Sequence, residues 1–276
     1  MRIDAHQHFW RYSPASHAWI DNSMPQIKRD FLPDDLQPLL AAAGFDGCIA
    51  VQAQQDVAES QWLLDLAAQH PFIKGVVGWV DLCAPDVATQ LAPLAANARL
   101  VGIRHIAQDE PDDFLVRDDF RNGVAALAQF DLAYDILIYA RQLPAAIDLV
   151  KRFPQQRFVL DHIAKPAIRD GDLMPWAKGI AEISRQHNVG CKLSGIVTEA
   201  GWQSWTRGDL MPYIDTIFDW FPPDRLMIGS DWPVCLLAAP YADAIALITD
   251  RIASLPAPDQ SAILGETATR IYNLTE

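Results

Sequence analysis

Positive charge is scarce in this sequence. The 276 residues include 22 Lys and Arg against 35 Asp and Glu, which gives a formal net charge of −13. A chain this acidic has no broad cationic surface for nucleic acid or an anionic membrane, so we expect neither as a partner. Long apolar runs are also missing, and none approaches the ~20 residues of a membrane-spanning helix. Met1 leads directly into a strand-like run without an apolar signal region, so we expect a cytoplasmic protein.

Cysteine is sparse as well. The four residues, Cys48, Cys83, Cys191 and Cys235, lie far apart and form no Cys-x-x-Cys pair. Three of them lie in or beside apolar runs, which predicts buried thiols in a reducing compartment. A glycine-rich phosphate loop and a Gly-x-Ser-x-Gly motif are absent, which argues against a nucleotide-dependent enzyme and a serine hydrolase. No linker, low-complexity tract or charge block divides the chain, so residues 1–276 are expected to form a single domain.

What the sequence does have is a regular alternation of strand-like and helix-like segments. The strand-like runs are Arg2–His6, Phe45–Val51, Ile73–Val80, Leu100–Arg104, Tyr134–Ile138, Arg157–Asp161, Gly190–Leu193 and Leu226–Gly229. The helix-like segments are Pro33–Ala43, Asp56–Gln69, Asp86–Ala96, Phe120–Phe130, Leu143–Phe153, Trp176–His187, Leu210–Phe221, Tyr241–Ser254 and a closing helix over Pro258–Tyr272. The alternation predicts a parallel sheet. Eight such units in a chain near the typical barrel length of about 250 residues favour a single (β/α)8 barrel, with a doubly wound open sheet as the alternative.

Two histidines, His6 and His8, lie at the end of the first strand-like run. Side chains two residues apart on a strand point to the same face, so the two imidazoles are expected to project together. Such a pair suits one divalent metal ion or one substrate oxygen. The alternative is a pair of solvent-facing histidines at a frayed terminus. The residues that follow the other runs are mostly polar, which fits an active site at the carboxyl ends of barrel strands. They are Gln52, Asp81, His105, Tyr139, His162, Ser194 and Asp231.

Four of these residues form a candidate metal site. His6, His8 and Asp231 come from the first and eighth strands, which become neighbours when a barrel closes, and His162 ends the sixth strand. Three imidazoles and one carboxylate can hold a single Zn²⁺ and leave a position for water. Without a metal, the same groups can polarise a carbonyl while Asp231 takes a proton from water.

Two basic residues near the same strand ends each have two interpretations. Arg104 suits a substrate carboxylate or a polarised oxygen, or else forms a salt bridge to Asp109 or Asp135. Lys165 contacts substrate, or else it neutralises Asp161.

Aromatic residues are the remaining candidates for the site. The loop from Phe9 to Phe31 is unusually long for a strand-to-helix connection, and its aromatic and basic content suggests a lid or a substrate wall. Packing by its own aromatic residues is the alternative. Trp79 is equally well explained as a core residue. The candidate substrate contacts are Trp10, Gln52, Trp79, His105, Tyr139, Lys165 and Trp232, and the remaining histidines, His17, His70 and His187, are expected to be structural.

Several motifs, in order along nearly the whole chain, carry a family resemblance. They are Asp4-Ala5-His6-Gln7-His8-Phe9-Trp10, Val77-Gly78-Trp79-Val80-Asp81-Leu82, Gly102-Ile103-Arg104-His105, Asp161-His162-Ile163-Ala164-Lys165-Pro166, Cys191-Lys192-Leu193-Ser194-Gly195 and Gly229-Ser230-Asp231-Trp232-Pro233-Val234. Together they resemble the amidohydrolase superfamily, and within it the branch that hydrolyses sugar lactones such as L-fuconolactone and L-rhamnonolactone. The resemblance implies a (β/α)8 barrel that opens the lactone ring of a sugar acid by water attack. It also implies that His6, His8, His162 and Asp231 line the site, with Asp231 as the general base. In the mechanism that we expect, a metal ion, or Arg104 with the histidines, polarises the lactone carbonyl, and protonated Asp231 or a neighbouring histidine such as His162 protonates the leaving ring oxygen.

The sequence departs from the two-metal pattern of this superfamily. The fourth strand offers Arg104 and His105 where a bridging lysine or glutamate is expected, and the fifth has no histidine. We therefore expect one divalent ion at most, with zinc the first candidate, and a metal-free mechanism stays open because the superfamily includes a metal-independent pyrone-dicarboxylate lactonase. The expected partner is a small sugar lactone such as L-fucono-1,5-lactone. The alternatives are a decarboxylase or a pyrone-dicarboxylate-type lactonase on the same barrel, and a non-catalytic barrel that binds sugar acids.

Overall fold

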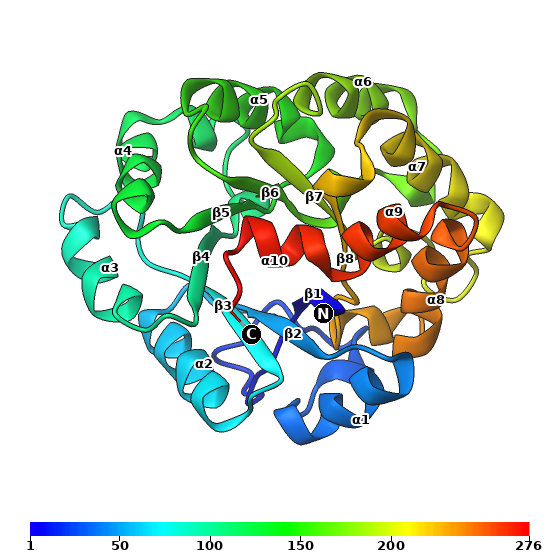
Figure 1. Cartoon of the computed structure of the whole chain (residues 1–276), viewed down its shortest axis with the longest axis horizontal. Helices are drawn as coiled ribbons and strands as arrows, with labels where there is room; N and C mark the ends of the chain where they lie inside the picture. The colour runs from blue at the N-terminus through cyan, green and yellow to red at the C-terminus, as the bar shows by residue number, and fades with distance from the viewer. Residues whose placement is uncertain (276) are drawn as a thin grey trace.

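Eight parallel strands lie side by side in chain order around a central axis (Figure 1) in this computed structural model, which describes residues 1–275. The strands are β1 (Ile3–Gln7), β2 (Gly47–Val51), β3 (Ile73–Gly78), β4 (Leu100–His105), β5 (Ala133–Ile136), β6 (Phe158–Leu160), β7 (Val189–Leu193) and β8 (Leu226–Ile228). The ring closes between β1 and the segment that follows β8, where the Asp231 amide donates to the His6 carbonyl at 2.8 Å and the His8 amide donates to the Trp232 carbonyl at 2.7 Å. The predicted (β/α)8 barrel is confirmed, and the open sheet is excluded.

A ring of helices surrounds the strands (Figure 1). Local sequence signals set several of their ends. The first helix begins at Pro33, where the missing amide costs nothing, and ends at Gly44 in the left-handed conformation. The Asp56 carboxylate caps the second helix by accepting from the Ala58 amide at 2.8 Å. The helices are α1 (Pro33–Ala43), α2 (Val57–Gln69), α3 (Val87–Ala95), α4 (Asp118–Leu127), α5 (Leu143–Arg152), α6 (Met174–Ile183), α7 (Arg207–Trp220), α8 (Tyr241–Ile252), α9 (Ala257–Ser261) and α10 (Thr267–Ile271).

The closing segment crosses one end of the barrel, beside the amino terminus (Figure 1). The sequence predicts one helix here, but the structure has α9, a π-helical turn over Ala262–Glu266 and α10. The irregularity falls at Gly265, where a Cβ atom would lie 2.1 Å from the Met1 carbonyl oxygen. The chain start therefore approaches this turn too closely for any side chain. Because α10 covers this end, the functional site is left to the opposite end, where the strands terminate.

Two apolar clusters form the core. The larger one packs the strands against the surrounding helices, and the smaller one joins strand residues to the side chains of α10 and the residues after it. The smaller cluster consists of Ile3, Ala5, Ile49, Val51, Val77, Val101, Ala133, Val159, Met227, Ala268, Ile271, Tyr272 and Leu274. Nearly every strand residue is buried, as expected for a parallel sheet covered on both faces.

All four cysteines are free thiols. Cys48, Cys191 and Cys235 are buried, as their apolar neighbours predict, and Cys83 is partly exposed. Among residues 1–275, no helix is both long enough and apolar enough to span a membrane.

Candidate metal and active site

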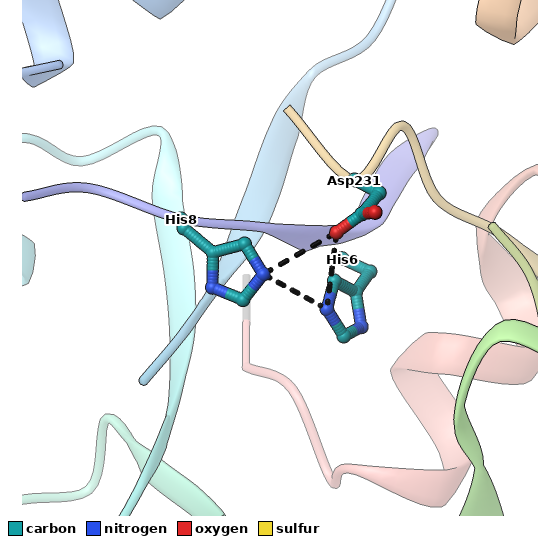
Figure 2. Close-up of side chains that lie close together, drawn as sticks. All are labelled: His6, His8 and Asp231. Carbon is teal, nitrogen blue, oxygen red and sulfur yellow. Dashed lines mark hydrogen bonds and ion pairs between the residues drawn. The ribbon is translucent and has the colours of Figure 1, made fainter. Parts of the chain in front are cut away.

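His6 and His8 project together at the carboxyl end of β1, and Asp231 meets them from the loop after β8 (Figure 2). The Nε2 atoms of the two histidines lie 3.2 Å apart. The Asp231 Oδ1 atom lies 3.8 Å from Nε2 of His6 and 3.4 Å from Nε2 of His8. All three side chains are buried or nearly so. The spacing of the two histidines and the closure of the barrel thus bring these groups together, as the sequence predicts.

The Asp4 carboxylate fixes this arrangement from below. Its Oδ1 atom accepts hydrogen bonds from the Ser230 amide at 2.9 Å and from the His6 amide at 3.2 Å. Its Oδ2 atom accepts one from the Tyr241 hydroxyl at 3.2 Å. Burial raises the pKa of Asp4 to about 6, against the lowering effect of these hydrogen bonds. Asp4 therefore ties the first strand to the loop that carries Asp231.

His162 joins the same group from the end of β6. Its Nε2 atom lies 3.9 Å from the Asp231 Oδ1 atom, and its Nδ1 atom is 2.9 Å from the Ser194 hydroxyl. Gly195 has a φ of +62°, and a Cβ atom there would lie 2.5 Å from Nδ1 of His162. A glycine is therefore required both by the backbone conformation and by the imidazole that packs on it.

The backbone around His162 is unusual. His162, Ile163, Ala164 and Lys165 all have positive φ, at 51°, 49°, 61° and 45°, and we call these four residues the left-handed turn. Such a conformation is costly for a β-branched residue such as Ile163, so surrounding contacts must hold it. The Trp176 indole donates to the Ile163 carbonyl at 2.6 Å, and the Lys165 amide donates to the His162 carbonyl at 2.8 Å. The left-handed turn places His162 and Lys165 on the same side of the barrel mouth.

The protonation of these groups favours a bound cation. The His8 Nδ1 atom is 2.8 Å from the Val51 carbonyl, which can only accept, so in neutral His8 the Nε2 atom carries the free lone pair. Burial lowers the pKa of both His6 and His162 well below the usual value, so both are neutral near pH 7. Burial alone would raise the pKa of Asp231. The electrostatic interaction with His162 and the interaction with His8 outweigh the effect of burial, so the pKa of Asp231 is lowered. The free Nε2 lone pair of His8 and the Asp231 carboxylate therefore lie on the same side of the site, 3.4 Å apart.

The distances agree with a metal site. Ligands placed tetrahedrally about 2.0–2.2 Å from Zn²⁺ are roughly 3.3–3.6 Å from one another. His6, His8 and Asp231 show separations of 3.2 to 3.8 Å, so their donor atoms fit one divalent ion. His6, Asp161 and His162 form a second group with ligand atoms close enough together to hold an ion. In that second group, however, the Lys192 ammonium lies 3.0 Å from Asp161 Oδ1 and 3.2 Å from His6 Nδ1, so a positive charge is already present.

A buried ionic network supports the histidines. Arg104 Nη1 lies 3.1 Å from Asp161 Oδ2 and 3.3 Å from His6 Nε2. The prediction that Arg104 forms a salt bridge to Asp109 or Asp135 is therefore wrong. Its guanidinium pairs with Asp161 instead. The prediction that Lys165 neutralises Asp161 is also wrong, because the Lys165 ammonium lies beside Glu199.

Three members of this network were not expected to be functional. Lys192 Nζ lies 2.5 Å from Asp135 Oδ2, and the Lys192, Asp135 and Asp161 side chains are all fully buried. The sequence feature that could have indicated this network is a lysine within the otherwise apolar strand Val189–Leu193.

A cleft of about 420 Å³ opens above these groups. Of the predicted site residues, the cleft is lined by His8, Trp10, Arg104, Tyr139, His162, Lys165 and Asp231. Lining residues that the sequence did not single out are Met24, Ala53, Ile106, Gln108, Leu137, Thr198, Glu199, Trp202, Val234 and Leu237. Trp19 of the first loop and Asp109 also belong to the lining. His6 is completely buried beneath the cleft floor.

Four predicted substrate contacts do not face the cleft, contrary to expectation. Trp232 is buried, with its ring centroid 5.1 Å from that of Phe31. Gln52 is also buried, and its amide donates to the Arg104 carbonyl at 3.2 Å, so it positions the strand that carries the arginine.

The other two form a pair at the side of the barrel mouth. The Trp79 indole Nε1 lies 3.4 Å from His105 Nδ1, and the His105 Nε2 atom lies 3.1 Å from Glu110. The His105 ring also stacks on Phe114 with ring centroids 4.8 Å apart. Trp79 and His105 are therefore held by their neighbours and are not among the residues that line the cleft.

The long first loop forms a wall of the cleft. Trp10 is fully buried and donates from its indole to the Arg29 carbonyl at 2.9 Å, which anchors the loop to the core. Trp19 packs edge-on against Trp10 and is 41% exposed at the mouth. His17 is buried beside Trp10, which agrees with its expected structural role.

A parallel barrel with two histidines at the end of β1, a third after β6 and an aspartate after β8 is the arrangement that the family resemblance implies. A family model described as amidohydrolase matches residues 3–274, so the chain belongs to the amidohydrolase family.

Individual proteins similar to this chain carry more specific names than the family does. The chain is 44% identical to an L-fucono-1,5-lactonase of Burkholderia multivorans over 100% of this chain and 97% of that protein. It is 41% identical to an L-fucono-1,5-lactonase of Burkholderia ambifaria over 88% of this chain and 83% of that one. A crystal structure of an amidohydrolase from Burkholderia multivorans with bound zinc has a TM-score of 0.96, 42% identity and complete coverage of both chains.

Proposed function

We propose that this protein hydrolyses the lactone ring of a sugar acid, with L-fucono-1,5-lactone as the first candidate substrate. The observation that carries the proposal is the position of Asp231, whose Oδ1 atom lies 3.4 to 3.9 Å from the Nε2 atoms of three histidines and lines an open cleft. The full-length identity of 44% to an L-fucono-1,5-lactonase supports the choice of substrate.

Asp231 acts as the general base. Its lowered pKa keeps the carboxylate ionised near pH 7, so it can accept a proton from a water molecule in the cleft. The water oxygen then attacks the lactone carbonyl carbon. Arg104 lines the same cleft and is a permanent cation, so it can stabilise the negative charge that develops on the carbonyl oxygen.

The second half of the reaction returns the proton. The tetrahedral intermediate collapses by breaking the bond between the carbonyl carbon and the ring oxygen. Protonated Asp231 gives its proton to this oxygen, which becomes a hydroxyl group of the open-chain product. The new carboxylic acid releases one proton to solvent, so each turnover acidifies the solution by one equivalent.

One divalent ion, with zinc the first candidate, would be held by His6, His8 and Asp231, with His162 beside them. Such an ion supplies Lewis acidity toward the carbonyl and lowers the pKa of water. The protein's own contribution is to keep the His6 and His162 imidazoles neutral by burial and to hold the His8 ring through the Val51 carbonyl.

A panel of aldonolactones with a pH indicator tests the proposed function. L-Fucono-1,5-lactone should release acid well above its spontaneous rate, and the assay is repeated after chelation and after addition of zinc. The Asp231→Asn variant provides the background rate. If no lactone releases acid above that background, with or without zinc, the proposal fails. Release of CO2 from an aromatic carboxylate would favour the decarboxylase alternative.

A further inference from the structure

The cleft holds a second pair of opposite charges beside the reacting groups. Lys165 Nζ lies 3.8 Å from Glu199 Oε1, and the two side chains are 17% and 19% exposed. At this distance the groups attract each other but do not form a hydrogen bond. Within residues 1–275, neither the ammonium nor the carboxylate makes a hydrogen bond, although the ammonium lies 5.5 Å from the centroid of the Tyr139 ring. Both groups line the cleft and can therefore form hydrogen bonds to a ligand there.

Both residues lie in turns at the barrel mouth. Lys165 is the last residue of the left-handed turn. Glu199 ends a short turn over Val197–Glu199, in which the Thr198 hydroxyl donates to the Gly195 carbonyl at 2.8 Å. Burial raises the pKa of Glu199, partly offset by Lys165. A largely desolvated ion pair with unused donors and acceptors is poorly compensated, which suggests that a ligand completes its hydrogen bonding.

The chemistry of this ligand follows from the charges of the cleft. The cations of its lining are Arg104, which lies beside Asp161, and Lys165, which lies beside Glu199. Each cation is already balanced by a neighbouring carboxylate, and the Glu199 charge would repel a carboxylate on the substrate. A neutral hydroxyl group fits better, because it accepts from an ammonium and donates to a carboxylate at the same time.

The apolar part of the lining supports a sugar ring. Trp19, which is 41% exposed, and the partly buried Trp202 line the cleft together with the charged pair. A sugar lactone has apolar ring faces, which pack on indole rings, and hydroxyl groups at its edge, which need polar partners.

We propose that Lys165 and Glu199 form a subsite that binds a hydroxyl group of the lactone and thereby selects uncharged, polyhydroxylated lactones. The Lys165 ammonium donates to the hydroxyl oxygen, and the hydroxyl donates to Glu199. This inference rests on the proposed lactonase function and adds to it a specificity-determining residue, Glu199. Lactones without hydroxyl groups lose these bonds, and lactones that carry a carboxylate are repelled by the Glu199 charge.

The test compares kcat/KM for three substrates: L-fucono-1,5-lactone, the unsubstituted δ-valerolactone and a lactone that carries a carboxylate. The parent should strongly prefer the hydroxylated lactone. Glu199→Gln and Lys165→Met should each reduce the ratio of hydroxylated to unsubstituted substrate by about tenfold to a hundredfold, the effect of a lost hydrogen bond to a charged group. Glu199→Gln should also raise kcat/KM for the carboxylate-bearing lactone, because Lys165 is then free, and an unfolded variant cannot produce this gain.

The matched control is Glu182→Gln. Glu182 pairs with Lys151 at 2.7 Å on the outer surface, so its loss removes the same charge without touching the cleft. The substrate ratio should stay at the parental value in this variant. If the parent hydrolyses lactones but Glu199→Gln leaves the ratio unchanged, the subsite is wrong and the lactonase function stands. If the parent hydrolyses no lactone, the proposed function fails and the subsite fails with it.

Discussion

Lys192 and Asp135 form an ion pair beneath the candidate site, with Nζ 2.5 Å from Oδ2 and both side chains fully buried. The Tyr272 hydroxyl, just after α10, donates to the same carboxylate at 2.8 Å. Lys192 also lies 3.0 Å from Asp161 Oδ1. The pair therefore connects the segment that closes one end of the barrel to the aspartate beside His6 at the other end.

Replacing Lys192 by methionine should destabilise the protein strongly. Asp135 and Asp161 would lose the ammonium that neutralises them, and breaking a buried ion pair typically costs about 3–5 kcal/mol. Urea unfolding of Lys192→Met measures this loss. The exposed pair of Lys151 and Glu182 provides the control, because surface pairs contribute only about 0–1 kcal/mol, so Lys151→Met should have little effect. Equal losses in the two variants would contradict a role for the buried network.

The Asp231→Asn variant should lose turnover and stay folded. A carboxylate accepts the proton of the attacking water and an amide does not, and the loss of a general base typically reduces the rate about 10²–10⁴-fold. The change keeps the size of the side chain, so the melting temperature should change little. Both quantities are measured on one sample. A kcat within about threefold of the parent, under 1 kcal/mol in activation free energy, would end the assignment of the base.

Most of the fold could be predicted from the sequence because its strands are buried on both faces. Such strands appear as short continuous apolar runs, and helix boundaries carry local signals such as Pro33 and Gly44. The closing helix was predicted less well. Its irregularity at Gly265 results from the approach of Met1, a contact between the two ends of the chain that no local pattern reveals.

The residues of the candidate site that lie at the carboxyl ends of strands could be predicted from the sequence. His6 and His8 share a face by their spacing, and Asp231 meets them because the first and eighth strands become neighbours. The supporting network was not predictable in this way, because Lys192 appears in the sequence as a lone charge that interrupts an apolar strand. Pairing it with Asp135 requires the distances between strands that only the folded barrel provides.

Metal analysis should find at most one tightly bound divalent ion per chain. The donors of His6, His8 and Asp231 fit one ion, and Lys192 places its positive charge where a second would bind. His8→Ala should weaken zinc binding, measured by calorimetry and by elemental analysis after dialysis. His187→Ala, which removes an exposed histidine, should bind zinc as the parent does. Two tightly held ions per chain would contradict this expectation.

Truncation of Trp19 should weaken substrate binding without unfolding the barrel. Its indole lines the cleft and is 41% exposed, so it can pack against a sugar ring at little structural cost. Aromatic contacts of this kind contribute about 0.5–1.5 kcal/mol, so KM for the lactone should rise about two- to tenfold in Trp19→Ala. Trp220 is 45% exposed on α7 and provides the control. If Trp19→Ala and Trp220→Ala change KM equally, the loop wall does not contact the substrate.

Glu59 should make stability depend on pH. It is buried on α2, and burial raises its pKa from 4.5 to about 7 even though the Ala53 and Gln54 amides donate to it at 3.0 and 2.8 Å. Between pH 4.5 and 7 the native state therefore holds a proton that the unfolded state has lost. Stability then falls as pH rises through this range, by up to about 3 kcal/mol from this residue alone.

The Glu59→Gln variant isolates this effect, because glutamine does not titrate. Asp4 and Asp135 also have pKa values raised to about 6, but they are present in both proteins and cancel in the difference. The free energy of unfolding of Glu59→Gln relative to the parent should therefore increase from pH 5 to pH 8 and then level off. Urea unfolding of both proteins across this range measures the difference. A difference that stays constant with pH would show that Glu59 is ionised in the native protein throughout, with its two backbone hydrogen bonds outweighing the cost of burial.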